Sequence, residues 1–425
     1  MKASELLKKV EGGALSAYSH IYGDIADQTA RYAAAVRSFI ELYGDDREAY
    51  LFSVPGRTEV LGNHTDHQRG CVLAAAIDRD VIAVASPTEN GVIRVKSEGY
   101  PEDTVKISDC GDPAAFADFS SASLIAGTAG GFASRGFATG GFDAYTTSRV
   151  LKGSGISSSA AFEVMIGNIM NYLYNDGKIA NEEIAKIAQF AENKYFGKPS
   201  GLMDQMACAV GGFVFIDFAD NANPIIEPIS FSLTDAGIVL CILNTGGNHA
   251  DLNDDYASVP IEMKKVAAYF GKDVLRGITE AQLIANLPLL RAAAGDRAVL
   301  RALHFVREND RVRAVAASLK KGDVDAFLAG VLASGSSSFQ YLQNVYTVKN
   351  VEEQGLSLSL CLAEGLLSDK GCAWRVHGGG FAGTTQAFVR KEYAEDYRMV
   401  TDSVFGEGAC MMLAIRPVGA TRIDL

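Results

Sequence analysis

The sequence predicts a two-domain protein in which helices and strands are mixed. At 425 residues the chain is too long for one hydrophobic core of typical size. A polar stretch with proline and asparagine, from Ala219 to Pro228, lies near the middle of the chain. It predicts a boundary with residues 1–225 in an N-terminal domain and residues 226–425 in a C-terminal one. Both halves contain apolar residues at helical spacing and short runs typical of strands.

Composition and charge exclude several classes of function. The chain is 48% hydrophobic and 21% charged, as in ordinary globular proteins, and its net charge is −12. An acidic protein has no general attraction for nucleic acid, so we expect no such partner. No apolar run has the length of a signal peptide at the start or of a membrane helix elsewhere. The seven cysteines show no CxxC spacing, which favours free thiols in a cytoplasmic protein. We expect a monomer or a weak dimer.

Local patterns place the elements of the first half. The first 50 residues carry helical periodicity, and residues 72–100 alternate like strands. Residues 126–142 are rich in glycine and alanine, which predicts a connection without regular structure. Apolar residues recur at helical spacing from Phe162 to Leu173, and Gly177 is expected to end this helix.

A second helix is expected to begin at a capping Asn181 and to end at Gly197. Glu192 falls at the edge of its apolar stripe, about 40° from Ala188 on a helical wheel. A carboxylate at a core boundary requires a cation or hydrogen-bond donors.

The second half continues the mixture of element types. Strands are predicted at 213–218, 238–243, 387–389 and 411–415, and helices at 261–270, 299–306 and 351–366.

The most informative segment, residues 55–70, reads PGRTEVLGNHTDHQRG. It places Arg57, His64 and Asp66 among turn-forming glycines, between two apolar runs. Polar side chains this dense, flanked by core-type sequence, are typical of a binding site on a rigid scaffold. His64, Asp66 and His67 lie within four consecutive positions, so they cannot readily converge on one zinc ion.

A second polar segment, residues 152–160, reads KGSGISSSA and directly precedes the helix that contains Phe162. Its glycines allow a ligand to approach the backbone closely, and free N–H groups at a helix start favour phosphate. A serine-rich helix cap with no ligand is an open alternative. A Walker-type loop is excluded because no GxxxxGK[ST] string occurs in the chain.

Two further strings could carry chemistry. Residues 201–205, GLMDQ, place Asp204 after a glycine turn and before an apolar strand, where capping a turn is the commoner use of aspartate. Residues 375–383, RVHGGGFAG, satisfy GxGxxG. The residues that follow, TTQAFV, predict a strand, whereas a dinucleotide-binding loop leads into a helix.

Residues 56–67 closely resemble the sugar-binding signature of galactokinases, GRxNxIGEHTDY. Glu59 stands where that family has asparagine, and Asn63 stands where it has glutamate.

The other three segments resemble galactokinase motifs in the family's order. Residues 153–160 resemble the GLSSSA phosphate loop of the GHMP kinases, the superfamily that contains galactokinases. The string around Asp204 resembles GIMDQ, and residues 378–383 resemble GGGFGG. The resemblance spans the chain from Arg57 to Gly383, although the SCPELD-like segment of the family is not recognisable after Tyr346.

This resemblance implies an α+β, two-domain GHMP-kinase fold. The N-terminal domain would be like a ribosomal-protein domain and the C-terminal one ferredoxin-like, with the site in the cleft between them. It also implies ATP-dependent phosphorylation of a monosaccharide at C1, galactose first. Two alternatives stay open: a kinase for another sugar, because of Glu59 and Asn63, and a non-catalytic sugar sensor on the same scaffold. The full-length serine loop and the retained Asp204 favour an enzyme.

The resemblance also implies roles for individual residues. Asp204 would be catalytic, with Arg57 holding it ionised. The residues expected to bind the sugar are Asn63, His64, Asp66, Tyr256 and Gly379, although the arginines that usually follow the tyrosine are missing. The residues expected to hold the ATP phosphates are Gly153, Ser154, Gly155, Ser157, Ser158 and Ser159. Ser159 and Glu192 would bind Mg²⁺.

Overall fold

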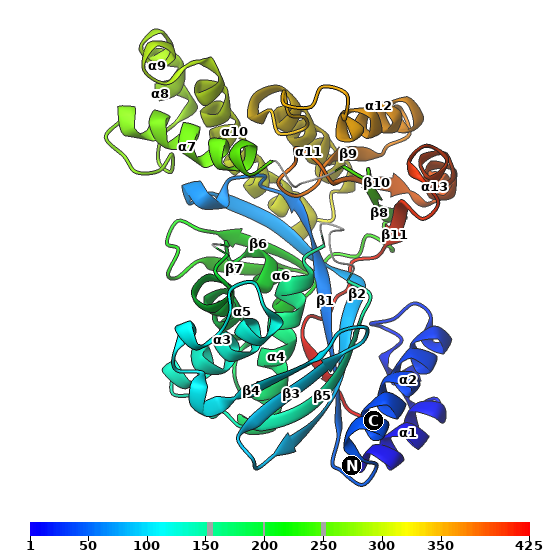
Figure 1. Cartoon of the computed structure of the whole chain (residues 1–425). Helices are drawn as coiled ribbons and strands as arrows, with labels where there is room; N and C mark the ends of the chain where they lie inside the picture. The colour runs from blue at the N-terminus through cyan, green and yellow to red at the C-terminus, as the bar shows by residue number, and fades with distance from the viewer. Residues whose placement is uncertain (151–155, 199, 248–251) are drawn as a thin grey trace.

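The computed structural model describes residues 1–150, 156–198, 200–247 and 252–425. They form two β-sheets with helices packed against them (Figure 1). The larger sheet has the order β12-β1-β2-β5-β3-β4, and β6 extends it by pairing with both β2 and β7. Its strands are β1 Tyr50–Leu61, β2 Cys71–Thr88, β3 Val92–Ser97, β4 Glu102–Lys106, β5 Gly141–Ser148, β6 Phe213–Asp217, β7 Ile225–Ile229 and β12 Thr421–Ile423.

Helices cover both faces of the larger sheet, because neighbouring residues of each strand point to opposite sides. Leu51 packs with α1 and α2, whereas Phe52 packs in the core beneath the other group of helices. These helices are α1 Ala3–Glu11 and α2 Ile25–Tyr43 on one face, and α3 Ser121–Ser134, α4 Ser158–Tyr174, α5 Asn181–Ala191 and α6 Met203–Val210 on the other.

The smaller sheet has the order β11-β8-β10-β9. Its strands are β8 Ile238–Asn244, β9 Ala373–Val376, β10 Thr384–Arg390 and β11 Cys410–Leu413. The accompanying helices are α7 Asn253–Tyr269, α8 Glu280–Ala285, α9 Leu287–Ala294, α10 Asp296–Lys320, α11 Val324–Ser337, α12 Gly355–Leu367 and α13 Lys391–Phe405. Helices α7 to α9 project away from this sheet, whereas α11 to α13 lie around it (Figure 1).

Strands β1 and β2 connect the two halves. They form a long antiparallel pair that leaves the larger sheet and reaches α10 (Figure 1). The pairing register is irregular between Pro55 and Arg57 and again between Glu59 and Leu61. Such bulges bend a strand and re-aim its side chains. The bulges lie beside Arg57 and Glu59, two polar residues of the segment 56–67, hereafter the signature segment.

The structure contradicts the prediction of an irregular connection over residues 126–142. Residues up to Ser134 belong to α3, and β5 begins at Gly141. Helix α3 can hold several glycines because they let other groups come close: a Cβ at Gly127 would lie 2.8 Å from Ala191, and one at Gly130 would lie 2.4 Å from the carbonyl oxygen of Cys110. Tertiary packing therefore overrides the low helix propensity of glycine.

The cap predicted at Asn181 is also wrong. Ala180 occupies the N-cap position, and Asn181 is the first helical residue, with its side chain donating to the carbonyl oxygen of Ala420. The predicted helix end holds: a π-helical turn, Glu192–Phe196, continues α5 and stops at Gly197, which has a φ of 81°.

The larger sheet takes strands from both sides of residue 225. Strand β7 pairs with β6, and β12, close to the C-terminus, pairs with β1. The domain boundary at 225/226 remains a prediction.

Within the described ranges, no helix combines the length and apolar character needed to cross a membrane. All seven cysteines are free, and six of them are buried.

Candidate active site

The signature segment forms a tight turn between β1 and β2. Gly62 begins it with a φ of 104°, and a Cβ there would lie 2.7 Å from the backbone of β2, so only glycine fits. The hydroxyl of Thr65 donates to the carbonyl oxygens of Gly62 and Cys71 and closes the turn. His64 has a φ of 58°, a left-handed conformation that is uncommon outside glycine. The turn thus presents its polar side chains from a fixed backbone.

Arg57 and Asp204 form a two-pronged ion pair. Arg57 Nε lies 2.6 Å from Asp204 Oδ1, and Nη2 lies 2.7 Å from Oδ2. Ser157 also donates its hydroxyl to Asp204 Oδ2. Ser157 has a left-handed φ of 58° at the start of α4, and its side chain does not cap that helix. Three segments far apart in the sequence therefore meet at one carboxylate.

The surroundings of Asp204 favour its ionised form. Burial would raise the pKa of this carboxyl, but Arg57 and the hydroxyl of Ser157 outweigh that effect and leave the pKa below its usual value. Asp204 lies in the first turn of α6, where the helix dipole also favours a negative charge. The predicted turn before a strand is therefore wrong: Met203–Val210 is helical, and β6 begins only at Phe213.

Glu192 is surrounded by donors, as its position at a core boundary requires. Its side chain is 2% exposed. Oε1 accepts from Ser159 Oγ at 3.2 Å and from Lys198 Nζ at 2.9 Å. Oε2 accepts from Ser200 Oγ at 2.6 Å and from Gln205 Nε2 at 2.8 Å. Sequence reasoning missed Lys198, Ser200 and Gln205, because no local pattern shows that these side chains turn back towards Glu192.

This cluster fits a magnesium ion in the presence of phosphates. A serine hydroxyl and a carboxylate in direct contact are hard oxygen donors, and Mg²⁺ commonly takes one or two protein oxygens together with phosphate oxygens and water. The described residues contain no group of three or more His, Cys, Asp or Glu side chains that could hold a metal alone. Of the predicted phosphate-binding residues, Ser158 is the first residue of α4, and Gly153, Ser154 and Gly155 lie outside the described residues.

Asn63 is fully buried and uses its side chain on protein partners. Its Nδ2 donates to Glu59 Oε1 at 2.8 Å and to the carbonyl oxygen of Gly378, and its Oδ1 accepts from Asn344. Burial raises the pKa of Glu59, and the nearby Arg375, with Nη2 at 3.7 Å from Oε1, opposes that rise.

The residues of the glycine loop, 378–383, lie against the predicted sugar-binding residues. Its first three carbonyl oxygens each accept a hydrogen bond from a different side chain: the first from Asn63, the second from His64 Nε2 at 2.8 Å and the third from the Tyr256 hydroxyl at 2.8 Å. A Cβ at Gly379 would lie 2.6 Å from the ring of Tyr256, so this position has no room for a side chain. A strand, β10, follows the loop and excludes a dinucleotide-binding loop, as predicted.

Asp66 lies next to Gly201, where an added Cβ would be 2.5 Å from its Oδ2. Both residues line a cavity of about 340 Å³ that also contains His67 and Ser200. The structure therefore brings Asp66 close to the segment that carries Asp204.

Behind the signature segment lies a buried polar layer that sequence reasoning did not find. His304, on α10, has Nε2 at 3.0 Å from the carbonyl oxygen of Asn63, and its Nδ1 is 2.9 Å from Ser337 Oγ. Glu308 accepts from the backbone N–H of Gly62 at 3.1 Å. His304 is fully buried, and both of its ring nitrogens have partners. No local motif marks these residues.

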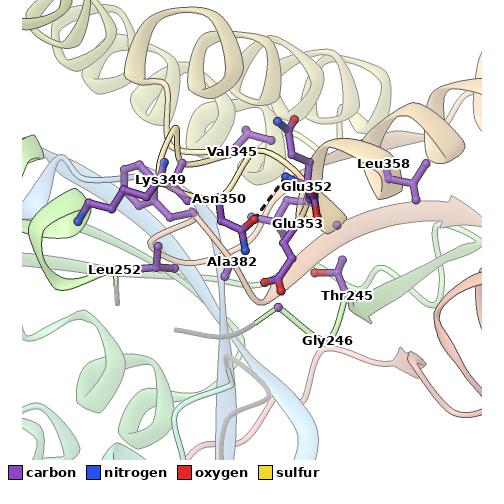
Figure 2. Close-up of a pocket in the computed structure, with 16 residues that line it drawn as sticks. Thr245, Gly246, Leu252, Val345, Lys349, Asn350, Glu352, Glu353, Leu358 and Ala382 are labelled. Atoms are coloured by element: carbon purple, nitrogen blue, oxygen red, sulfur yellow. Dashed lines mark hydrogen bonds between the residues drawn. The ribbon is translucent and has the colours of Figure 1, made fainter. Parts of the chain in front are cut away.

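A larger cavity of about 850 Å³ lies beside the glycine loop, lined by Phe381 and Ala382 of that loop together with Leu252 and residues 345–358 (Figure 2). In Figure 2, Asn350 accepts a hydrogen bond from the backbone N–H of Glu352. None of the predicted sugar-binding residues lines this cavity.

Comparisons with known proteins agree with this geometry. Residues 121–212 match the model of the GHMP kinases N terminal domain, and residues 37–87 match that of the galactokinase galactose-binding signature. These two matches, the ion pair at Asp204 and the glycine loop define the class of the protein. It is a GHMP kinase, which is a phosphotransferase with two α+β halves.

Relatives specify the class further. The chain is 31% identical to a galactokinase of Streptomyces coelicolor over 91% of its own length and 97% of that protein. It is 29% identical to a galactokinase of Mycobacterium tuberculosis over 83% and 92%. The chain therefore belongs to the galactokinase family.

Solved structures share the fold. The crystal structure of Lactococcus lactis galactokinase complexed with galactose superposes with a TM-score of 0.75 at 22% identity, covering 91% of this chain and 98% of that one. The Methanococcus jannaschii mevalonate kinase superposes with a TM-score of 0.61 at 13% identity, covering 87% and 98%.

Proposed function

We propose that the protein transfers the terminal phosphate of ATP to the C1 hydroxyl of galactose. The observation that carries this proposal is the carboxylate of Asp204, held by Arg57 and Ser157 between the signature segment and the start of α4. Membership of the galactokinase family supports the choice of sugar.

Asp204 would orient the sugar rather than act as a strong base. A carboxylate whose pKa is lowered by a neighbouring arginine is a weak proton acceptor. Phosphoryl transfer through a loose transition state needs little deprotonation of the nucleophile before the bond to phosphorus forms. Asp204 would therefore accept a hydrogen bond from the C1 hydroxyl, align it and take its proton late. Arg57 would keep the carboxylate ionised and offset negative charge that develops nearby.

Ser159 and Glu192 would hold a magnesium ion, which neutralises phosphate charge when it is bound. Lys198, whose ammonium group donates to Glu192 Oε1 at 2.9 Å, would add positive charge beside the phosphates. Ser157, Ser158 and Ser159, with the backbone N–H groups at the start of α4, would bind the phosphates.

His64, Asp66 and Tyr256 would contact the sugar, and Gly379, whose missing side chain lets the ring of Tyr256 approach, would line the sugar site. In the free protein His64 and Tyr256 donate to the glycine loop instead. Sugar hydroxyls would then replace or supplement these carbonyl partners. For its cellular setting we propose the cytoplasm, where ATP and magnesium are available.

A sugar panel in a coupled ADP-release assay tests the proposal. We expect turnover with galactose that depends on Mg²⁺, and a sugar 1-phosphate as the product by phosphorus NMR. Absence of turnover with galactose, or phosphate on another hydroxyl, would contradict the proposed function.

A further inference from the structure

Asn344 joins two of the segments that carry predicted sugar-binding residues, the one with Asn63 and the one with Gly379. It lies just after the π-helical turn Ser338–Leu342, which follows α11, and it is fully buried. Its side-chain Nδ2 donates to Asn63 Oδ1 and to the carbonyl oxygen of Gly379, the latter at 3.1 Å. Its own carbonyl oxygen accepts from the backbone N–H of Phe381. One residue therefore contacts both the signature segment and the glycine loop.

The backbone around these contacts is held in unusual conformations. Phe381 has a left-handed φ of 60°, which is a genuine outlier for a bulky residue. A Cβ at Gly380 would lie 2.0 Å from the carbonyl oxygen of Asn344. Such conformations persist only where the surrounding structure enforces them, and they gather at ligand-binding loops. The hydrogen bond from Phe381 to Asn344 is one of the contacts that enforce this one.

The amide of Asn344 cannot be replaced by its neighbours. Asn63 uses its own Nδ2 on Glu59 and Gly378, so it has no second donor to offer across the gap. The two hydrogens of Asn344 Nδ2 match two acceptors, one on each segment. Without this amide, Asn63 Oδ1 would lose its partner and the glycine loop would keep only His64 at its second carbonyl.

We propose that Asn344 is a positioning residue for the sugar: it fixes the spacing between the signature segment and the glycine loop, and so sets the affinity for the sugar without touching it. This inference rests on the proposed function. Its effect should fall on the sugar and not on ATP, because Asn344 contacts neither the serine segment at the start of α4 nor Glu192 in the hydrogen bonds that the structure shows for it.

The test compares Asn344→Leu with Asn350→Leu, a matched control at an exposed position on the following loop. Loss of one buried hydrogen bond of average strength corresponds to about a fivefold change in affinity, and the side chain of Asn344 makes two. We therefore expect Asn344→Leu to raise the KM for galactose about tenfold or more, with the KM for ATP and kcat within about threefold of the parent. Asn350→Leu should leave the KM for galactose unchanged.

Asn344→Asp supplies a readout that a merely structural role would not move, and it serves if the leucine variant does not fold. An ionised carboxylate cannot donate to Asn63 Oδ1 or to Gly379, whereas a protonated carboxyl can donate to one of them. The galactose affinity of this variant is measured by calorimetry without nucleotide and divided by that of the parent at the same pH. This ratio should rise towards one as the pH is lowered from 8 to about 5.

The outcomes separate this inference from the function on which it rests. One contrary result is a parent enzyme that phosphorylates galactose while the Asn344 variants keep its KM for galactose. Another is an active parent with Asn344 variants that raise the KM values for galactose and ATP equally. Either result would overturn the role of Asn344 and leave the proposed function standing. A parent that does not phosphorylate galactose would overturn the proposed function and this inference with it.

Discussion

The side chains of Glu59 and Asn63 are hydrogen-bonded to each other, with Asn63 Nδ2 2.8 Å from Glu59 Oε1. These are two of the positions at which the chain departs from the galactokinase signature, one amide and one carboxylate in exchanged order. Because the two side chains are in contact, the exchange keeps a carboxylate–amide pair in the same place beside Arg375. Asn63 is also fully buried, and its amide holds neighbouring protein groups in place through hydrogen bonds to Glu59, Gly378 and Asn344.

The contact predicts that the pair must be changed together. Asn63→Glu alone would place two carboxylates side by side in a buried site, so we expect it to lower both the free energy of unfolding and the affinity for galactose. Glu59→Asn combined with Asn63→Glu should recover much of both losses. Coupling between contacting residues is typically 0.5–3 kcal/mol, which a double-mutant cycle by urea unfolding can resolve. Additive effects of the two changes would show that the pair does not act as a unit.

Removing the charge at Asp204 should affect turnover far more than nucleotide binding. Positioning or general-base groups typically contribute 10²–10⁴-fold to rate, so Asp204→Asn should lower kcat by about that factor. Binding of an ATP analogue, measured by calorimetry, should change little. Activity within about threefold of the parent would rule out the role proposed for this carboxylate.

Removing the charge at Glu192 should weaken the binding of magnesium. If Glu192 and Ser159 hold Mg²⁺ between the phosphates, Glu192→Gln should raise the Mg²⁺ concentration for half-maximal activity several-fold and weaken ATP binding. Sugar binding without nucleotide should hardly change. Glu182→Gln, in the first turn of the same helix, is the matched control. Equal loss of sugar and ATP affinity would identify Glu192 as structural.

Acid should destabilise the protein through its buried histidines. Burial lowers the pKa of His304 to about 4 and that of His377 to about 3, from the ordinary value of 6.5. The unfolded chain therefore binds more protons as the pH falls below about 6.5, and the stability of the folded state decreases until about pH 4 for His304. The loss from this residue is on the order of 3 kcal/mol. Thermal unfolding from pH 7.5 to 4.5 should show it, and His304→Gln should flatten the profile. An unchanged profile in that variant would contradict the assignment.

Two helical glycines predict opposite effects of alanine. A Cβ at Gly130 in α3 would lie 2.4 Å from the carbonyl oxygen of Cys110, so Gly130→Ala should destabilise the protein by about 1–3 kcal/mol. Gly365 in α12 has nothing within 4 Å of an added Cβ, so Gly365→Ala should stabilise it by roughly 0.5–1 kcal/mol. Urea unfolding measures both. A tolerated alanine at position 130 would mean that α3 can move away from its neighbours.

The sequence by itself determined the class of the protein and pointed to the residues that we propose for its active site. Arg57, Asp204 and Glu192 were predicted from local strings, because catalysis and phosphate binding require particular residue types at short, recognisable spacing. The donors that Glu192 requires were predicted from its place on a helical wheel, and the structure confirms them. Long periodic helices such as α4 were also predicted, because their apolar stripe repeats over several turns.

Only the tertiary structure decided which residues support that chemistry. Asn344 and His304 belong to no motif, and each reaches its partner only after distant segments have packed together. Lys198 is six residues from Glu192, but no local pattern shows that its side chain turns back to that carboxylate. The same holds for α3, whose glycines discourage a helix locally but allow the close packing that stabilises it. Even the exchange of Glu59 and Asn63 could be interpreted only in three dimensions, because a sequence gives the order of two residues and the fold gives the hydrogen bond between them.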